Sequence, residues 1–478
     1  MATDAMLQFV RRDQAYPAKR APGDRAGDFA EIAARYALPD AADQAGRCSQ
    51  CGVPYCAVHC PLGNHIPDWL RLTAEGRYRE AFELSNATST MPEICGRVCP
   101  QDRLCEGNCV IEFSGHGAVT IGAVERFITD KAWEEGWVEP VAVGRPRGRS
   151  VGVIGAGPAG LTAAEYLRGH GYDVHVYDRH DRAGGLLTYG IPGFKLEKHV
   201  VARRVERLRQ GGIVFHHGFA VGADATLDEL RARHDAVLIA CGVYRPKPID
   251  VPGADGAVAA LDYLTASNRK GFGDAAPPFD DGALSAGGKH VVVIGGGDTA
   301  SDCVGTAFRQ NALSVTQLDI RPQPPEREDK LTVWPYWPVK MRVSSSQAEG
   351  AEREFEAATL RIEGKKGRCT GVVCARVDAK RKPVPGTEFV LKADLVFMAI
   401  GFAGSVAEGL VQESGVAVDR RGNVAADEAG YRTSDEKVFA AGDMRRGQSL
   451  IVWAIREGRQ AAQAIDVHLT GESILPRK

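Results

Sequence analysis

A short glycine-rich stretch, Val151-Gly-Val-Ile-Gly-Ala-Gly-Pro-Ala-Gly160, constrains the fold more than any other part of the chain. Its apolar start predicts a buried strand, and its spaced glycines predict a tight turn that opens a helix. Gly155 allows the turn, Gly157 lets the backbone approach a pyrophosphate, and Gly160 lets the helix pack closely on the strand. Because unpaired N–H groups and the helix dipole favour an anion at the helix N-terminus, the stretch predicts a dinucleotide-binding unit.

The residues after the turn favour this interpretation over an ordinary glycine turn. Asp173–Asp178 predicts the next strand, and Asp178 comes about 20 residues after the motif, where a carboxylate binds a ribose hydroxyl. Farther on, the stretch Ala183–Pro192 contains a glycine pair at which backbone can approach a flat ring. A cofactor with a flat ring is therefore expected beside the first motif.

The motif recurs in the second half of the chain. Val291–Ala300 has the same pattern, with Gly295 and Gly297 followed by an alanine in place of the third glycine. The strand-like stretch His234–Gly242 has a look-alike, Ala393–Gly401, which ends the second unit. The chain therefore contains an internal repeat of two dinucleotide units.

At the adenosine end of the second unit, the residues give opposite indications of coenzyme specificity. The predicted strand Val315–Arg321 contains Asp319, which favours a free 2′-hydroxyl, whereas Arg321 and Arg327 favour a 2′-phosphate. Both arginines also fit a solvated loop. We expect NADPH at this site.

The C-terminal segment returns to the first unit. Val438–Asp443 predicts a short strand that ends in Gly-Asp, and Ser449–Gly458 predicts the start of a helix. In a flavoprotein such an aspartate can hydrogen-bond the ribityl chain, and the helix N-terminus favours negative charge on a reduced flavin. The second unit is thus expected to be inserted into the first.

Residues at these turns and strand ends are the predicted cofactor contacts. In the first unit they are Gly155, Gly157, Pro158, Gly160, Asp178, Gly185, Leu186, Gly442, Asp443 and Leu450, and in the second Gly295, Gly297, Asp298, Thr299, Ala300 and Arg321. Hydride transfer needs no general acid or nucleophile, so no catalytic side chain is predicted. No cysteine lies between Gly160 and Cys241, and Cys303 has no partner two or three residues away, which excludes the redox disulfides of glutathione-reductase-like and thioredoxin-reductase-like flavoenzymes.

The overall charge and the absence of long apolar runs limit the possible partners. The formal net charge is −2, with 25% charged residues, so neither a nucleic-acid footprint nor an acidic tail is indicated. The longest apolar runs fall well short of a membrane-spanning helix, and the N-terminus has charges throughout. We expect a cytoplasmic protein without a nucleic-acid or membrane partner.

Eight of the twelve cysteines lie in one block between residues 48 and 109. They form two runs of four, each with a cysteine directly followed by proline: Cys48, Cys51, Cys56 and Cys60, then Cys95, Cys99, Cys105 and Cys109. In two-cluster ferredoxins the fourth cysteine of such a run serves the other cluster. Structural zinc and plain buried cysteines are the alternatives, but zinc usually takes ligands in closely spaced pairs, so the block predicts two [4Fe–4S] clusters.

One carboxylate belongs to the same region. Ile121, Val124, Ile128 and Ala132 form one apolar face of a predicted helix, and Glu125 falls in the middle of it. A carboxylate on a buried face needs a partner. That partner is either a cation in a buried salt bridge or the iron of a cluster.

These features together resemble the small-subunit family of bacterial NADPH-dependent glutamate synthases over essentially the full chain. The cysteine block and the two glycine motifs are shared with a wider group that includes the N-terminal half of dihydropyrimidine dehydrogenase. More selective for the glutamate synthase branch are three stretches: Pro322–Pro325, Trp334–Pro338 and Ser344–Gly350.

The resemblance implies FAD at the first site, NADPH at the second and two low-potential [4Fe–4S] clusters. The clusters would pass electrons to a large subunit with FMN, which makes two glutamates from glutamine and 2-oxoglutarate, so a hetero-oligomer is expected. In the dehydrogenase relative a glutamine is the fourth ligand of one cluster, and the matching position here, sixteen residues beyond Cys109, is Glu125. The resemblance thus favours Glu125 as a ligand over Cys95. The alternative function is a stand-alone NAD(P)H oxidoreductase with ferredoxin or polysulfide as acceptor.

The predicted architecture is α/β with three parts. A helical iron–sulfur domain spans residues 1–145, a Rossmann-like FAD domain spans 146–283 and 405–478, and a second Rossmann-like domain for NADPH spans 284–404. Linkers rich in Pro and Gly, near residues 140–149 and 271–288, set these boundaries.

Overall fold

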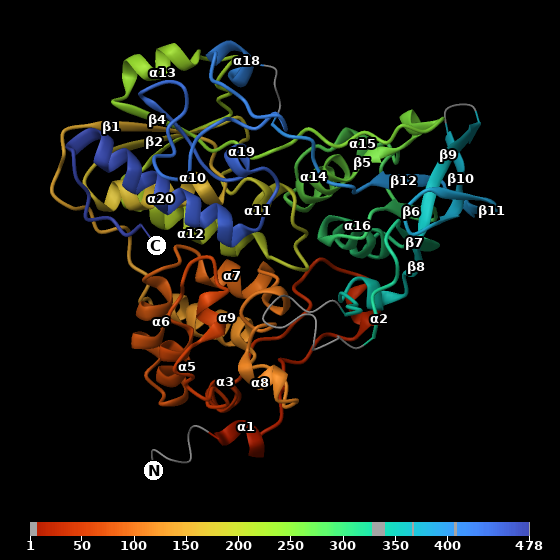
Figure 1. Cartoon of the computed structure of the whole chain (residues 1–478), viewed down its shortest axis with the longest axis horizontal. Helices are drawn as coiled ribbons and strands as arrows, with labels where there is room; N and C mark the ends of the chain where they lie inside the picture. Colours follow the sequence, from red (N-terminus) through yellow and green to blue (C-terminus); the bar gives the residue numbers. More distant parts are fainter. Residues whose placement is uncertain (1–6, 327–339, 366–367, 406–408, 478) are drawn as a thin grey trace.

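The structure is a computed structural model that describes residues 7–326, 340–365, 368–405 and 409–477. It has three parts: an N-terminal helical domain and two α/β units, each built on a parallel sheet (Figure 1). Arg327 and the stretch Trp334–Pro338 lie outside the described residues. In the part of the chain that is described, no helix is both long enough and apolar enough to cross a membrane.

The N-terminal domain consists of short helices joined by the cysteine-containing loops. The helices are α1 Gln8–Arg11, α2 Pro22–Arg25, α3 Leu38–Ala45, α4 Tyr55–Val58, α5 Ile66–Ala74, α6 Tyr78–Asn86, α7 Pro92–Val98, α8 Val110–Phe113 and α9 Ile121–Glu134, with a 3₁₀ turn at Gln101–Arg103. Proline occupies the first turn of α3, α5 and α7, where its missing N–H costs no hydrogen bond. Helix α9 buries the apolar face that the sequence predicts, and Glu125 is buried with it.

The first α/β unit contains a five-stranded parallel sheet of order β13-β4-β1-β2-β3. Its strands are β1 Ser150–Ile154, β2 Asp173–Asp178, β3 Val214–His217, β4 Ala236–Ile239 and β13 Val438–Ala440. Its helices are α10 Pro158–Gly169, α11 Leu186–Tyr189, α12 Lys198–Gln210, α13 Leu227–Arg233, α18 Leu410–Ser414, α19 Asp443–Arg446 and α20 Ile451–Thr470. Because β13 pairs with β4, the C-terminal segment completes this sheet, and the predicted insertion of the second unit into the first is confirmed.

The second α/β unit contains a parallel sheet of order β5-β12-β6-β7-β8 and a three-stranded antiparallel sheet. The parallel strands are β5 Val258–Ala259, β6 His290–Ile294, β7 Ser314–Asp319, β8 Glu352–Phe355 and β12 Leu395–Met398, and the helices are α14 Ala260–Gly271, α15 Pro277–Asp280 and α16 Asp298–Arg309. The antiparallel strands are β9 Ala357–Lys365, β10 Arg368–Val377 and β11 Pro383–Lys392. They project from the edge of the unit in Figure 1.

The chain enters the second unit earlier than the linker composition predicts. Strand β5 pairs with β12, and α14 packs in the same core as α16, so residues from 258 onward lie with the second sheet, whereas the predicted boundary is residue 284. The two connecting segments run antiparallel: Lys247 N–H donates to Gly401 O at 3.0 Å and Ala403 N–H to Arg245 O at 2.8 Å. The composition shift at 271–288 therefore marks a surface loop inside the second unit.

The helical domain packs directly on the first α/β unit. Ile94, Cys95 and Cys99 belong to the same buried apolar cluster as Leu187 and Val452 of that unit. Across the same interface the buried Arg204 of α12 makes a bidentate salt bridge with the buried Glu93 of α7, at 2.8 and 2.7 Å. The cysteine loops are thereby fixed against the first dinucleotide unit.

Candidate functional site

The first glycine turn has the backbone geometry that its sequence predicts. Gly155 has φ of +105°, and a Cβ there would lie 2.5 Å from Ala240 O. A Cβ on Gly160 would lie 2.0 Å from Gly155 O. Around Gly157, in contrast, no atom lies within 4 Å of an added Cβ, and α10 begins at the next residue, Pro158. The turn therefore leaves open space in front of a helix N-terminus, as a pyrophosphate requires.

Two further segments meet this turn. Asp178, at the end of β2, accepts hydrogen bonds from Ala156 N–H at 2.7 Å and His180 N–H at 2.8 Å, which fixes its carboxylate beside the turn. Gly184 N–H donates to Ala156 O at 2.8 Å, and a Cβ on Gly185 would come within 3.0 Å of Gly157 Cα. The structure thus brings the predicted contacts of the first unit, which are about 30 residues apart in sequence, to one place.

The C-terminal contacts lie beside the same turn. A Cβ on Gly442, which has φ of +72°, would lie 2.7 Å from the Ala159 side chain of α10. Asp443 accepts a hydrogen bond from Ser449 Oγ at 2.6 Å just before α20 begins, and burial raises the pKa of its carboxyl. The sequence did not single out the buried Glu457, which accepts from Gly442 N–H at 2.9 Å and holds this loop.

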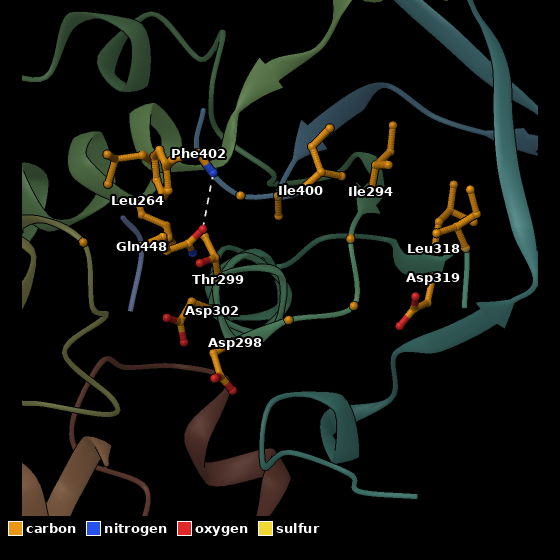
Figure 2. Close-up of a pocket in the computed structure, with 18 of the residues that line it drawn as sticks. Leu264, Ile294, Asp298, Thr299, Asp302, Leu318, Asp319, Ile400, Phe402 and Gln448 are labelled. Atoms are coloured by element: carbon orange, nitrogen blue, oxygen red, sulfur yellow. Dashed lines mark hydrogen bonds between the residues drawn. The ribbon is translucent and has the colours of Figure 1, made fainter. Parts of the chain in front are cut away.

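The second glycine turn repeats the first. Gly295 has φ of +134°, with Ala399 O only 2.3 Å from an added Cβ, and Gly297 has open space. Helix α16 begins at Asp298. In Figure 2, Asp298, Thr299 and Asp302 project from α16, while Asp319 lies at the end of β7 on the other side of the turn.

The two residues that gave opposite signals at the adenosine end form a salt bridge with each other. Arg321 donates from Nε to Asp319 Oδ1 at 3.0 Å and from Nη2 to Oδ2 at 2.8 Å. The Arg321 side chain is 56% exposed, whereas that of Asp319 is only 12% exposed. The pairing compensates the carboxylate, which on its own would repel a 2′-phosphate.

A cavity of about 830 Å³ lies between the two units (Figure 2). Leu186, Asp443 and Leu450 line it from the first unit, and Gly297 and Thr299 line it from the second. At one side Gln448 of the first unit accepts a hydrogen bond from Phe402 N–H of the second at 3.3 Å, drawn as a dashed line in Figure 2. Predicted contact residues from both units, though not the first glycine turn itself, therefore face a common space that is large enough for the reactive rings of two cofactors.

One ion pair at this cavity, between a buried carboxylate and a partly exposed lysine, was not predicted. Asp302, which lines the cavity from α16, forms a salt bridge with Lys195 of the first unit. Burial raises the pKa of the Asp302 carboxyl, and the Lys195 ammonium opposes that rise. The sequence places Asp302 one helical turn beyond Asp298. Its partner Lys195 is 107 positions away, so only the structure reveals the pair.

The eight cysteines of the N-terminal block fall into two groups, and none of them forms a disulfide. The first group surrounds a small cavity and contains three cysteines of the first run and the last of the second: Cys48, Cys51, Cys56 and Cys109. The second group contains the remaining cysteines, Cys60, Cys95, Cys99 and Cys105, together with Glu125. Burial raises the pKa of Cys99 far above its usual value, and neighbouring Cys60 and Glu125 raise it further.

This grouping exchanges the fourth cysteine of each run, as in two-cluster ferredoxins. Four thiols around an otherwise apolar cavity match the donor set of a [4Fe–4S] cluster. Over the described part of the chain, no three His, Cys, Asp or Glu side chains are placed to hold a single metal ion.

Glu125 lies in the second group without a cationic partner in the described residues. Its Oε1 accepts a hydrogen bond from Ser85 Oγ at 3.4 Å, and burial raises the pKa of its carboxyl to about 8. The salt bridge considered from the sequence is absent from the described part of the structure.

Two family descriptions match this chain. Residues 25–137 match dihydropyrimidine dehydrogenase domain II, 4Fe-4S cluster, and residues 149–458 match pyridine nucleotide-disulphide oxidoreductase.

Two relatives that match over nearly their full length carry the same name. The chain is 52% identical to the glutamate synthase [NADPH] small chain of Azospirillum brasilense, over 100% of this chain and 99% of the relative. It is 44% identical to the protein of the same name from Mycobacterium tuberculosis, over 98% and 96% of the two chains. Among solved structures, Mycobacterium tuberculosis FprA in complex with NADPH superimposes with a TM-score of 0.53 at 18% identity, over 68% of this chain and 85% of that one, which shows a shared fold.

Proposed function

Because this chain belongs to the glutamate synthase [NADPH] small-chain family, we propose that it is the electron-input subunit of a glutamate synthase. It oxidises NADPH at FAD and passes the electrons through [4Fe–4S] clusters to a large subunit that carries FMN. That partner makes glutamate from glutamine and 2-oxoglutarate, in a cytoplasmic hetero-oligomer.

One observation carries this proposal: part of the second cysteine group lies in the same buried apolar cluster as the first dinucleotide unit. Cys95 and Cys99 share that cluster with Leu187 and with Val452 of α20. An electron that leaves the first cofactor site therefore has a cysteine group directly beside it, without crossing solvent. Cys48, Cys51 and Cys56 are partly exposed, so the first group lies nearer the surface and is the place for electrons to leave toward the large subunit.

The residues of the chain position the cofactors. We assign FAD to the first turn, with Gly155, Gly157, Gly160, Asp178 and Gly185 at its pyrophosphate and ribose, and NADPH to the second turn. When bound, these cofactors supply hydride transfer and single-electron transfer. The chain places the N-cap residue of α20, Leu450, beside the cavity between the two turns, where the helix N-terminus favours negative charge.

We assign two clusters. Cys48, Cys51, Cys56 and Cys109 hold one, and Cys60, Cys99 and Cys105 hold the other, with Glu125 as its fourth ligand. Glu125 is preferred over Cys95 because a buried carboxylate without a cation is costly, and bound iron removes that cost. A buried thiol beside Ser89, as Cys95 is at 3.8 Å, is stable as it stands.

The proposal is tested by anaerobic purification with the large subunit, followed by iron and labile-sulfide counting and an assay of NADPH-dependent glutamate formation. We expect about eight irons per chain, since two four-iron clusters make eight. We also expect glutamate formation to depend on the cysteine block. A chain that reduces dyes with NADPH but supports no glutamate formation with its partner would instead indicate a stand-alone oxidoreductase. Glu125→Ala should lower the iron count, whereas Cys95→Ala should not; the reverse result would make Cys95 the ligand.

A further inference from the structure

A second and larger cavity, of about 1240 Å³, adjoins the first at the Gly297 turn. It runs past Asp319 at the end of β7 and past β8. Three arginines from separate segments line it there: Arg321 after β7, Arg353 in β8 and Arg381 in the turn between β10 and β11. The prediction from sequence included only the first of them.

Arg353 is held in place by groups that leave its charge uncompensated. Its Nη1 donates to the carbonyl oxygen of Arg342 at 3.0 Å, and its guanidinium lies over the ring of Phe355 with the carbon 4.7 Å from the ring centroid. Within the described residues no carboxylate forms a salt bridge with it. Burial lowers the pKa of Arg353, Asp319 opposes that shift and Arg321 adds to it, so the three side chains lie within electrostatic reach of each other.

The charge balance at this end of the cavity is positive. Asp319 is already paired with Arg321. Of the other carboxylates that line the cavity, Glu31 pairs with Arg97, Asp102 with Arg342 and Asp302 with Lys195. Asp298 and Glu106 also line it and form no salt bridge among the described residues, but neither belongs to β7, β8 or the β10–β11 turn. A half-buried guanidinium without a counterion favours a bound anion.

The third arginine is presented by a strained turn. Val377 N–H donates to Glu356 O at 2.9 Å, which brings the β10–β11 turn beside the end of β8. In that turn Arg381 has φ of +62°, a conformation that costs a non-glycine residue about 1 kcal/mol. Glycine or asparagine would fit the turn better, so the position retains an arginine against its local backbone preference.

We propose that Arg353, acting with Arg321, binds the phosphate on the 2′-oxygen of the adenosine ribose and is a specificity-determining residue for NADPH over NADH. This inference rests on the proposed function, which places the dinucleotide on the second glycine turn. The ribose then lies at the end of β7, and its 2′-phosphate reaches the space between Arg321 and Arg353. Arg381 closes that space from the β10–β11 turn.

The test measures nucleotide binding to the complete protein by calorimetry, apart from any turnover. The probes are adenosine 2′,5′-bisphosphate and AMP, which differ by the 2′-phosphate alone. Arg353→Gln keeps an N–H donor for the Arg342 carbonyl and removes the charge. It is expected to weaken binding of the bisphosphate by about 10- to 100-fold and to leave AMP binding unchanged.

Arg376→Ala is the matched control. Arg376 also lies over a phenylalanine ring, that of Phe389, at 4.7 Å, but it pairs with Glu354 at 2.8 Å and does not line the cavity. It should bind both probes like the wild type. Arg353→Lys, which keeps the charge but not the planar group, is expected to fall between Arg353→Gln and the wild type.

The outcomes separate this inference from the proposed function. A wild-type protein that binds both probes equally well would refute the NADPH assignment and this inference together. A wild type that prefers the bisphosphate, with the same preference retained in Arg353→Gln, would overturn the role of Arg353 alone. Equal weakening of both probes in Arg353→Gln would show a structural role and likewise overturn it.

Discussion

The two glycines of the second turn should respond in opposite ways to the same substitution, alanine. Gly297 has an ordinary extended backbone, with φ of −93°, and nothing lies within 4 Å of an added Cβ. Gly295 has φ of +134°, and its Cβ would lie 2.3 Å from Ala399 O. The first change should affect binding without affecting stability, and the second should affect stability.

The magnitudes follow from these positions. For Gly297→Ala, a weaker N-cap costs about 0.5–1 kcal/mol. The less flexible unfolded chain offsets this by about 0.4–1 kcal/mol, so stability should change by under about 0.5 kcal/mol. For Gly295→Ala, the left-handed conformation costs about 1–2 kcal/mol. Moving the backbone away from Ala399 O adds about 1–3 kcal/mol, which gives about 2–5 kcal/mol in all.

The assay combines urea unfolding, flavin content and calorimetric titration with NADP⁺. Gly297→Ala should keep its flavin and its stability but lose affinity for NADP⁺ by about tenfold or more, because the methyl group occupies the space that the pyrophosphate needs. The larger Gly297→Val should lose more. Normal NADP⁺ affinity in both variants would refute the placement of the dinucleotide, and loss of flavin to the same extent as NADP⁺ affinity would refute the assignment of the two cofactors to separate units.

Three other predictions concern the clusters, the adenosine site and a half-buried lysine. Cys99→Ser or Cys105→Ser should retain most NADPH-dependent dye reduction and abolish glutamate formation. Size-exclusion chromatography checks that the variant still assembles with the large subunit. An iron-depleted variant that assembles and still makes glutamate at the normal rate would show another electron route. Arg321→Gln should raise the KM for NADPH far more than that for NADH, and an equal rise would contradict a 2′-phosphate contact. Burial lowers the pKa of Lys198 from 10.5 to about 7. Between these pH values the Lys198 side chain is protonated in the unfolded chain but not in the folded one. The stability of the wild type should therefore rise with pH from 7 toward 10, relative to that of Lys198→Met. Parallel stability profiles for the two proteins would show that Lys198 is not buried in this way.

The two turns and the insertion could be predicted because their signals are local. Gly155 and Gly295 are each required by their own positive φ, which other residues rarely adopt. The repeated spacing of the motif reveals the second unit. The return of the chain to the first sheet follows from the position of a short strand that ends in Gly-Asp. Linker composition was a weaker guide, since the Gly- and Pro-rich stretch near residue 280 lies within the second unit and not at its border.

The remaining features depend on contacts between residues that are distant in sequence. Glu93 and Arg204 carry no signal of their pairing, yet their salt bridge is buried at 0% and 1% exposure and joins the helical domain to the first unit. Sequence periodicity could place Glu125 on a buried face, but whether a cation faced it depended on the packing of α6 against α9. Long-range polar partners are not set by local propensity, so no pattern in either segment reveals them.

The adenosine end of the second unit shows how this limit bears on specificity. Read along the chain, Asp319 and Arg321 contradict each other, because one favours a free hydroxyl and the other a phosphate. In the structure they form one ion pair, and Arg353, which β8 brings beside β7 from 34 positions away, has no carboxylate partner among the described residues. Once the carboxylate is compensated, the additional guanidinium decides the sign of the local charge. On the proposed role of Arg353, coenzyme preference at this site depends on the pairing of β7 with β8. A residue in β8 then contributes to that preference as well as the acidic residue that ends β7.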